Sequence, residues 1–485
     1  MEMKVYKVKK YNLPNINLLN INTNLQLNFN DKKELLISAK KLEKILSSFG
    51  IQIKSVEIIK GPLITRFELQ HLNYTNLAKI ISLKKDIAFA IGVKDIAIES
   101  FFEENKALVV VEVPNKARIP VFFREVLESI ELKKSNYEIA WALGKDMTGK
   151  SVVVDLNKII HILIGATMEK EKNICIDTFI VSVLYNYSPE DIKLLLIDLR
   201  IINFNIYNAI PHLLIPIITE NKKAIAALKW AIDEVNRRYK LFNNVGVKNI
   251  NSYNELVKKG LIDEKLSRIV IIINELADLM GVDQEKIEKL ICNLAQKGGC
   301  VGVHLIIGTQ VLSPNIITRL IKDSIPSKIS FITSNEYNSK IILDLIGAEK
   351  LLGKGDMLFY PLSELKPKRV QGAFISDEEI KNIVLFIKSA QVTGKEYEVL
   401  QHINPVNNNL NNKKKTDELL DEAIKIVVET GQVSTSYLQR RLRIGFNRAA
   451  RIVDELEKNR VISARDGNKP RQVLISKEKL NRNVR

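Results

Sequence analysis

The sequence has little of what marks disulfide-stabilised, metal-cluster or membrane-spanning proteins. Only three cysteines occur among 485 residues, and no two of them form a C-x-x-C pair, so no disulfide framework is indicated. There is no signal peptide and no run of about 18 or more apolar residues. We therefore expect a cytoplasmic protein with no membrane segment in this chain and with reduced core thiols. The histidines are scattered singly and predict no metal cluster: His71, His161, His212, His304 and His402.

Acidic residues are fewer than basic residues. Lys and Arg number 73 against 56 Asp and Glu, which gives a net charge of +17. Such an excess favours a polyanionic partner, either nucleic acid or an anionic membrane surface. A lysine-rich proteome with AT-rich coding explains the same excess, so charge leaves both interpretations open. The length and the apolar fraction of 46% predict two to four globular domains.

Local patterns divide the chain into five segments. Residues 1–30 are rich in Asn and predict a flexible N-terminal arm. Residues 31–145 combine helical and strand patterns, which indicates a small α+β domain. Residues 146–395 are expected to form the largest domain, and the low-complexity residues 396–416 a linker. Residues 417–478 predict three short helices and a hairpin, the pattern of a winged helix-turn-helix.

In the largest domain, apolar runs alternate with helical segments. The runs lie at 159–164, 193–198, 268–273 and 303–308. Alternation of this kind predicts an α/β fold with a mostly parallel sheet and helices on both faces. Ligands of such sheets bind at the carboxyl ends of the strands. We therefore expect a site at three polar strand ends: Asp198, Asn274–Glu275 and Thr309–Gln310.

The stretch 159–186 is a strand, a loop and a helix, the context of a phosphate-binding loop. Lys172 stands where the phosphate-binding lysine belongs. The pattern G-x-x-x-x-G-K-[ST] is otherwise broken, because this chain has Ala166, Glu171 and Asn173 at its other fixed positions. The sequence thus predicts a site with the shape of a nucleotide site and damaged chemistry.

Residues 144–151, GKDMTGKS, match the same pattern letter for letter. The following SVVVDL predicts a strand, and no helix begins there to place its N-terminus on a phosphate. We interpret the match as a turn between strands, with a phosphate site as the alternative.

The strand RIVIII ending in Asn274–Glu275 is typical of a Walker B strand. Glu275 can act as a general base that activates water. Asn274 is neutral, and a hard cation is held mainly by carboxylates and phosphates, so a magnesium site at Asn173 and Asn274 would be weak. A polar strand end with no ligand is the alternative.

The last domain concentrates arginines around its second and third helices. Arg can bind guanine edges or phosphates, and Asn can bind adenine, so we expect contact with DNA. A solvated basic face is the alternative. The expected DNA-binding residues are Arg440, Arg441, Arg443, Asn447, Arg448, Arg451 and Asp454.

Long stretches of the chain resemble the FtsK/SpoIIIE family of double-stranded-DNA translocases over roughly residues 12–476. They include GPLITRFELQ, IYNAIPHLL, NELADLM, GVHLIIGTQ, AEKLLGKGDMLFYP and RRLRIGFNRAARIVDELE. The resemblance implies an α domain, a RecA-like motor domain and a winged-helix γ domain. It implies a hexameric ring around duplex DNA, ATP and Mg²⁺ as cofactors, and a role in chromosome partition and cell division. It also implies site residues: Glu275 and Gln310 as catalytic residues, and Thr167, Lys170, Lys172, Asn173 and Asn274 for the nucleotide.

The departures from the family pattern lie in the motor domain. The family loop resembles GATGSGKS, with glycines at the positions of Ala166, Glu169 and Glu171. Two added carboxylates facing a triphosphate would lower the affinity for ATP. The γ stretch RIGFNRAAR, by contrast, matches closely. We therefore expect a translocase-like protein with impaired ATP hydrolysis. The alternative is a catalytically dead DNA-binding or assembly partner, in a homo-hexamer or in a mixed ring with an intact paralogue.

Overall fold

The computed structural model describes residues 11–22, 29–71, 77–93, 96–103, 106–115, 120–133, 136–200, 203–208, 210–390, 419–458, 461–463 and 471–474. The chain divides into two compact units, residues 1–403 and 404–485. The first unit holds two sheets and the second holds three helices.

A four-stranded antiparallel sheet opens the first unit, in the order β1-β2-β4-β3. Helix α1 covers it with α2 and α3, and side chains such as Leu42, Phe67 and Val109 form their shared core. Two short helices, α2 and α3, lie between β2 and β3 in the chain, and α3 stops at Gly92, which is in the left-handed region. The bounds are β1 (Ile53–Lys60), β2 (Ile64–His71), β3 (Ala97–Glu103), β4 (Lys106–Pro114), α1 (Phe29–Ser48), α2 (Leu77–Ser82) and α3 (Lys84–Ile91).

The second sheet has ten strands in the order β7-β6-β14-β13-β12-β8-β11-β10-β9, with β5 paired to β14. One half is parallel: β12 (Ser327–Ser330), β8 (His161–Gly165), β11 (Val303–Thr309), β10 (Arg268–Ile273) and β9 (Ile192–Ile197). Strands β8, β9, β10 and β11 match the four predicted apolar runs, whereas β12 was not predicted. The other half is mainly antiparallel: β7 (Ser151–Asp155), β6 (Ala140–Asp146), β14 (Lys368–Phe374), β13 (Asp356–Tyr360) and the short β5 (Val121–Phe122).

The strands of the large sheet bear on the expected domain boundary between residues 145 and 146. A boundary at 145 to 146 would cut strand β6, which pairs with β7 and β14 of the large sheet. Strand β5 also belongs to this sheet, through its parallel pairing with β14. The large sheet therefore begins well before residue 146.

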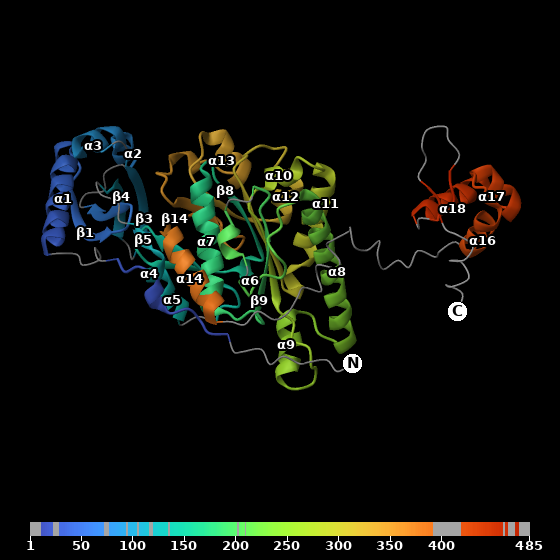
Figure 1. The fold of residues 1–485 in the computed structure, drawn as a ribbon. Coiled ribbons are helices and arrows are strands. Elements are labelled where there is room, and N and C mark those ends of the chain that lie inside the picture. The colour runs from blue at the N-terminus through green and yellow to red at the C-terminus, as the bar shows by residue number, and fades with distance from the viewer. Residues whose placement is uncertain are drawn as a thin grey trace. The chain divides into compact units, whose positions relative to one another are not determined.

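Helices cover both faces of the large sheet (Figure 1). Along strand β8, Ile162 and Ile164 enter the core on the α7 and α14 side, whereas Leu163 enters the core on the α8 and α11 side. Alternation of side chains between two buried faces is what a strand inside an α/β sheet requires. The described part of the chain holds no helix long and apolar enough to cross a membrane.

The helices around the large sheet range from four residues in α5 and α6 to 25 residues in α8. Their bounds are α4 (Phe123–Leu127), α5 (Ile130–Lys133), α6 (Leu156–Ile159), α7 (Glu169–Asn186), α8 (Asn221–Val245), α9 (Ile250–Lys258), α10 (Leu276–Met280), α11 (Gln284–Lys297), α12 (Arg319–Ser324), α13 (Glu336–Leu343) and α14 (Asp377–Ala390).

Residues 11–22 pack on the large sheet's helices, so the prediction of a flexible arm over residues 1–30 is wrong for this segment. The Tyr11 hydroxyl donates to the carbonyl of Leu184 (2.9 Å), and the amide of Asn20 donates to Glu379 (2.8 Å). Leu19 is 2% exposed. The polar composition gave no sign of these contacts, because each partner lies more than 150 residues away in the chain.

The GKDMTGKS stretch is the β6–β7 hairpin, which confirms the interpretation as a turn. Asp146 accepts the amides of Thr148 (2.9 Å) and Lys150 (3.0 Å). Gly149 has φ +87°, as a tight turn requires, and a Cβ on Gly144 would lie 2.1 Å from the carbonyl oxygen of Gln371 in β14. Both glycines of the match are thus explained by strand geometry.

Gly144→Ala is expected to destabilise the first unit by about 2–3 kcal/mol, because the added methyl group collides with backbone of a paired strand. Unfolding in urea, followed by tryptophan fluorescence, measures this loss, since Trp141 and Trp230 are the chain's two tryptophans and lie in the first unit. Lys150→Ala is the control: Lys150 is exposed in the same hairpin and should leave the midpoint unchanged. Equal midpoints for both variants would refute the close approach.

The described part of the second unit contains α16 (Leu420–Thr430), α17 (Thr435–Leu442) and α18 (Phe446–Lys458). Gly431 ends α16 with φ +69°, and the Ser434 hydroxyl caps α17 by accepting the amide of Tyr437 (3.0 Å). A bridge joins Ile462 to Val473, where the hairpin was expected. The unit has its own apolar core, and the expected linker 396–416 lies outside the described residues.

Candidate nucleotide site and nucleic-acid interface

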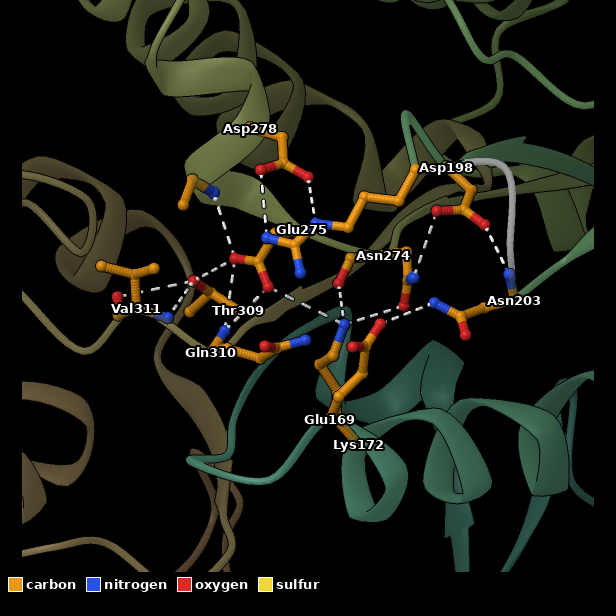
Figure 2. A network of polar contacts seen from close by, with 12 residues as sticks. Glu169, Lys172, Asp198, Asn203, Asn274, Glu275, Asp278, Thr309, Gln310 and Val311 are labelled. Atoms are coloured by element: carbon orange, nitrogen blue, oxygen red, sulfur yellow. Dashed lines mark hydrogen bonds and ion pairs between the residues drawn. The ribbon is translucent and has the colours of Figure 1, made fainter.

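The polar ends of β9, β10 and β11 meet, as the sequence predicted (Figure 2). The Glu275 carboxylate accepts the Thr309 hydroxyl (2.7 Å) and the amide of Gln310 (3.0 Å). The side-chain amide of Asn274 donates to Asp198 (3.3 Å). The three strand ends therefore form one connected polar cluster beside helix α7.

Helix α7 begins earlier than a phosphate loop allows. A phosphate loop wraps backbone N–H groups around the ligand over the residues before its lysine. Here only residues 166–168 separate β8 from α7, and Glu169, Lys170 and Glu171 already belong to the helix. The first N–H groups of the helix lack intrahelical partners, and carboxylates in the first turn are favoured there. The two glutamates thus lie where the pattern expects phosphate-binding backbone.

Lys172 is fully buried, with 0% of its surface exposed. Its ammonium group donates to the backbone carbonyl of Asn274 and to the side-chain oxygen of Asn274 (2.9 Å), and it lies 4.0 Å from the Glu275 carboxylate. Burial lowers the pKa of Lys172, and the charge of Glu275 acts against that fall. Gly308 makes room for the lysine, because a Cβ there would lie 2.8 Å from its Cδ. The ammonium group is therefore engaged by protein.

Both glutamates of the first turn also have protein partners. Glu169 accepts the side-chain amide of Asn203 (2.8 Å), and this hydrogen bond lowers the pKa of Glu169. Glu171 is 7% exposed and accepts the backbone amide of Gly355 (3.2 Å). Burial raises the pKa of Glu171. Its Oε2 finds no hydrogen-bond partner among the described residues.

Glu275, the expected general base, is held on several sides. Besides Thr309 and Gln310, it accepts the amide of Ala277 (3.3 Å) at the start of helix α10. Three donors thus fix the orientation of the carboxylate at the end of β10.

These residues do not fit a magnesium–triphosphate group in this arrangement. The lysine is paired inward, and the side-chain oxygen of Asn274 already accepts that lysine. The side-chain oxygen of Asn173 is buried and has no hydrogen-bond partner in the described part of the chain. No group of three or more His, Cys, Asp or Glu able to hold a metal occurs among the described residues. Thr167 and Lys170 are exposed and stand apart from this network.

Sequence reasoning missed three contributors to the site. Asn203 and Gly355 hold the two glutamates. Gly355 lies in the quoted stretch AEKLLGKGDMLFYP, but nothing in that stretch indicated a contact with Glu171. The bidentate pair of Arg200 with Asp278 (2.7 and 3.1 Å) flanks Glu275 (Figure 2). Asp278 was within reach of sequence reasoning, because it follows Glu275 by three residues in the first turn of a helix.

Most of the expected DNA-binding residues of the second unit are exposed. Asn447, Arg451 and Asp454 are exposed at i, i+4 and i+7 of α18, opposite the buried Ile452 and Leu456. Arg440, Arg441 and Arg443 are exposed on or just after α17, and Arg448 is partly buried. Arg443 has φ +54°, a left-handed conformation that residues other than glycine rarely adopt.

The sheet order, the cluster at its strand ends and the strand–loop–helix of β8 and α7 define an α/β unit with the fold of P-loop proteins. Family models for the FtsK alpha domain, the FtsK/SpoIIIE family and the FtsK gamma domain match residues 13–115, 123–314 and 414–476. The chain belongs to the FtsK/SpoIIIE family.

Similar proteins agree with this assignment. The chain is 52% identical to a DNA translocase FtsK of Clostridium tetani, a match that covers 99% of this chain and 64% of that protein. It is 40% identical to DNA translocase SpoIIIE of Bacillus subtilis, with 97% and 60% covered. The chain thus spans less than two thirds of these relatives. The pCW3 conjugation coupling protein TcpA, in its monomer form with ATPγS, shares the fold at a TM-score of 0.51 and 22% identity, covering 73% of this chain and 99% of that one.

Proposed function

We propose that this chain is a DNA-binding protein of chromosome partition and cell division, built as a double-stranded-DNA translocase but with impaired ATP hydrolysis. It acts in the cytoplasm as a homo-hexameric ring or as a subunit of a ring with an intact paralogue. The observation that carries the proposal is the inward pairing of Lys172 with Asn274 and Glu275. ATP hydrolysis with and without duplex DNA tests it.

A lysine that binds phosphate must offer donors to the ligand. Lys172 has three donors, and its surroundings supply the two oxygens of Asn274 and the carboxylate of Glu275. Binding ATP would break these contacts and place the triphosphate against Glu169 and Glu171. Like charges about 4 Å apart repel by roughly 4 kcal/mol at an effective dielectric of 20. Affinity for ATP and Mg²⁺ is therefore low.

A second candidate function is a catalytically dead assembly partner with no motor activity. Asn274 favours it, because the side-chain amide that stands at the Walker B position carries no charge and already pairs with Lys172 and Asp198. The two candidates differ only in residual ATP turnover, and both keep binding to duplex DNA by the second unit.

In the isolated second unit, residues 417–478, Arg451→Ala is expected to reduce preference among DNA sequences, because each base-edge contact is worth about 1–3 kcal/mol. Arg441→Ala should weaken binding to all sequences alike and make the salt slope shallower by about one unit, as loss of a phosphate contact does. Fluorescence anisotropy on a panel of duplexes across a salt series measures both effects.

Lys425→Ala serves as the control, because Lys425 is exposed on α16, outside the two arginine-bearing helices. It should leave sequence preference at the wild-type level. Absence of binding at low salt by the folded wild-type unit would leave only a solvated basic face. The same conclusion would follow if Arg451→Ala and Lys425→Ala behaved alike.

A further inference from the structure

We propose that the loop 352–355 is an anion receptor facing helix α7, and that Glu171 is its built-in anion. In this chain a carboxylate of the protein itself thus closes the nucleotide site. The proposal rests on the proposed impairment of ATP turnover and extends it, because it names what takes the place of a phosphate group and which loop that group holds.

The receptor is formed by backbone. Gly353, Lys354 and Gly355 are consecutive residues with φ of +72°, +56° and +88°. Successive N–H groups in such turns form a concavity that binds anions. The amide of Gly355 donates to Glu171 (3.2 Å), and a Cβ on Gly353 would lie 3.5 Å from the same carboxylate oxygen. The loop therefore wraps closely around one carboxylate.

Buried side chains hold this loop in shape. Asp356, which is fully buried, accepts the amide of Leu352 (2.7 Å) and pairs with Arg369 through two contacts (2.8 and 3.0 Å). Gln371, 4% exposed, donates to the carbonyl of Lys354 (2.9 Å). Since these contacts do not involve helix α7, the receptor is organised without Glu171.

The backbone of the loop is strained at Lys354, which has a positive φ. A residue with a side chain in the left-handed region is disfavoured by roughly 1–2 kcal/mol, and glycine is the usual choice. Glu171 is buried, and one of its oxygens has no partner among the described residues. A strained turn facing a buried anion indicates that the receptor needs an anion, and Glu171 provides one.

Glu169 has a parallel role on the other side of the helix start. It accepts Asn203, whose backbone amide donates to Asp198 (3.0 Å) at the end of β9. The first turn of α7 is thereby tied to Asn203 through Glu169 and to the loop 352–355 through Glu171.

Hydrogen exchange of the full chain tests the receptor directly. In Glu171→Gln, exchange in the segment 351–356 is expected to rise about tenfold, because the neutral side-chain oxygen of Gln accepts the Gly355 amide more weakly than a carboxylate does. The thermal midpoint of the first unit should fall by about 2–4 °C. Glu336→Gln is the matched control: Glu336 is also a first-turn glutamate, in α13, and is exposed, so both readouts should remain unchanged.

Inorganic pyrophosphate provides the second readout. The double variant Glu169→Gly/Glu171→Gly should gain protection in segment 351–356 when pyrophosphate is added, and the wild type should not. Unchanged exchange in Glu171→Gln, or equal effects of pyrophosphate on the two proteins, would overturn the receptor. ATP turnover by the wild type would overturn the proposed function alone, because the exchange readout needs no nucleotide.

Discussion

Acidification from pH 7.5 to pH 5 should weaken the first unit through three buried histidines, by about 2 kcal/mol each and about 6 kcal/mol together. Burial lowers the pKa of His161 and of His212 to about 4 and that of His304 to about 3. In the unfolded chain, where the histidine pKa is near 6.5, these side chains bind protons as the pH falls from 6.5 to 5. In the folded state the same side chains stay largely neutral over that range. Stability is therefore lost as the pH falls below 6.5, and the loss levels off near the folded pKa values.

Asp177 opposes this loss. Burial raises its pKa to about 7, so the folded state takes up a proton that the unfolded chain does not bind at pH 5. Between pH 7.5 and pH 5 this proton uptake adds about 2.5 kcal/mol to the free energy of unfolding. The net loss of stability is therefore about 3–4 kcal/mol. Glu171, whose pKa is also raised by burial, acts in the same direction as Asp177.

Urea midpoints by tryptophan fluorescence across pH 4 to 8 measure the balance. His304→Gln should remove about 2 kcal/mol of the acid-dependent loss, and Asp177→Asn should make the loss steeper by removing the compensation. A urea midpoint that stays constant between pH 7.5 and pH 5 would contradict the burial of these rings in neutral form. The same conclusion would follow if the midpoint changed with pH equally in the wild type and in His304→Gln.

Lys172→Ala is expected to destabilise the first unit by about 3–5 kcal/mol, a large effect for a residue at a ligand-binding position. The substitution removes the partner of Asn274 and Glu275 and leaves a cavity beside Gly308. Lys172→Met should lose less stability than Lys172→Ala, because methionine keeps most of the packed side-chain volume while removing the charge.

Chemical unfolding measures the loss, and Lys170→Ala is the control. Lys170 lies two residues away in the same turn and is exposed, so its removal should cost less than about 0.5 kcal/mol. Equal stability of Lys172→Ala and Lys170→Ala would mean that Lys172 is free to reach a ligand, contrary to its inward pairing.

Four strands of the parallel half, β8 to β11, were predictable, because strands buried on both faces appear as continuous apolar runs such as RIVIII. The short β12, SKIS, shows no such run. In the antiparallel half, β7 and the turn before it were predicted, but the rest was not. Its strands β13 and β14 carry the buried polar residues Asp356 and Gln371, which interrupt an apolar pattern. The packing of residues 11–22 was also hidden, since it depends on partners such as Leu184 and Glu379.

At the site, the sequence correctly placed Asp198, Asn274–Glu275 and Thr309–Gln310 together, because the carboxyl ends of neighbouring parallel strands share one edge. It did not predict that helix α7 begins at Glu169. A signal was present, since acidic residues are enriched in the first turn of helices, but the phosphate-loop pattern implied a later start. The Glu171 contact with Gly355 spans 184 residues and leaves no local trace.

The rate of ATP hydrolysis by the full chain, with and without duplex DNA, tests the proposed impairment most directly. Because Lys172 is paired inward, and because Glu169 and Glu171 stand where the family loop has glycines and are held by Asn203 and Gly355, we predict no DNA-stimulated hydrolysis above background. A turnover of several ATP per second per subunit on duplex DNA, of the order of ordinary enzyme turnover, would contradict it.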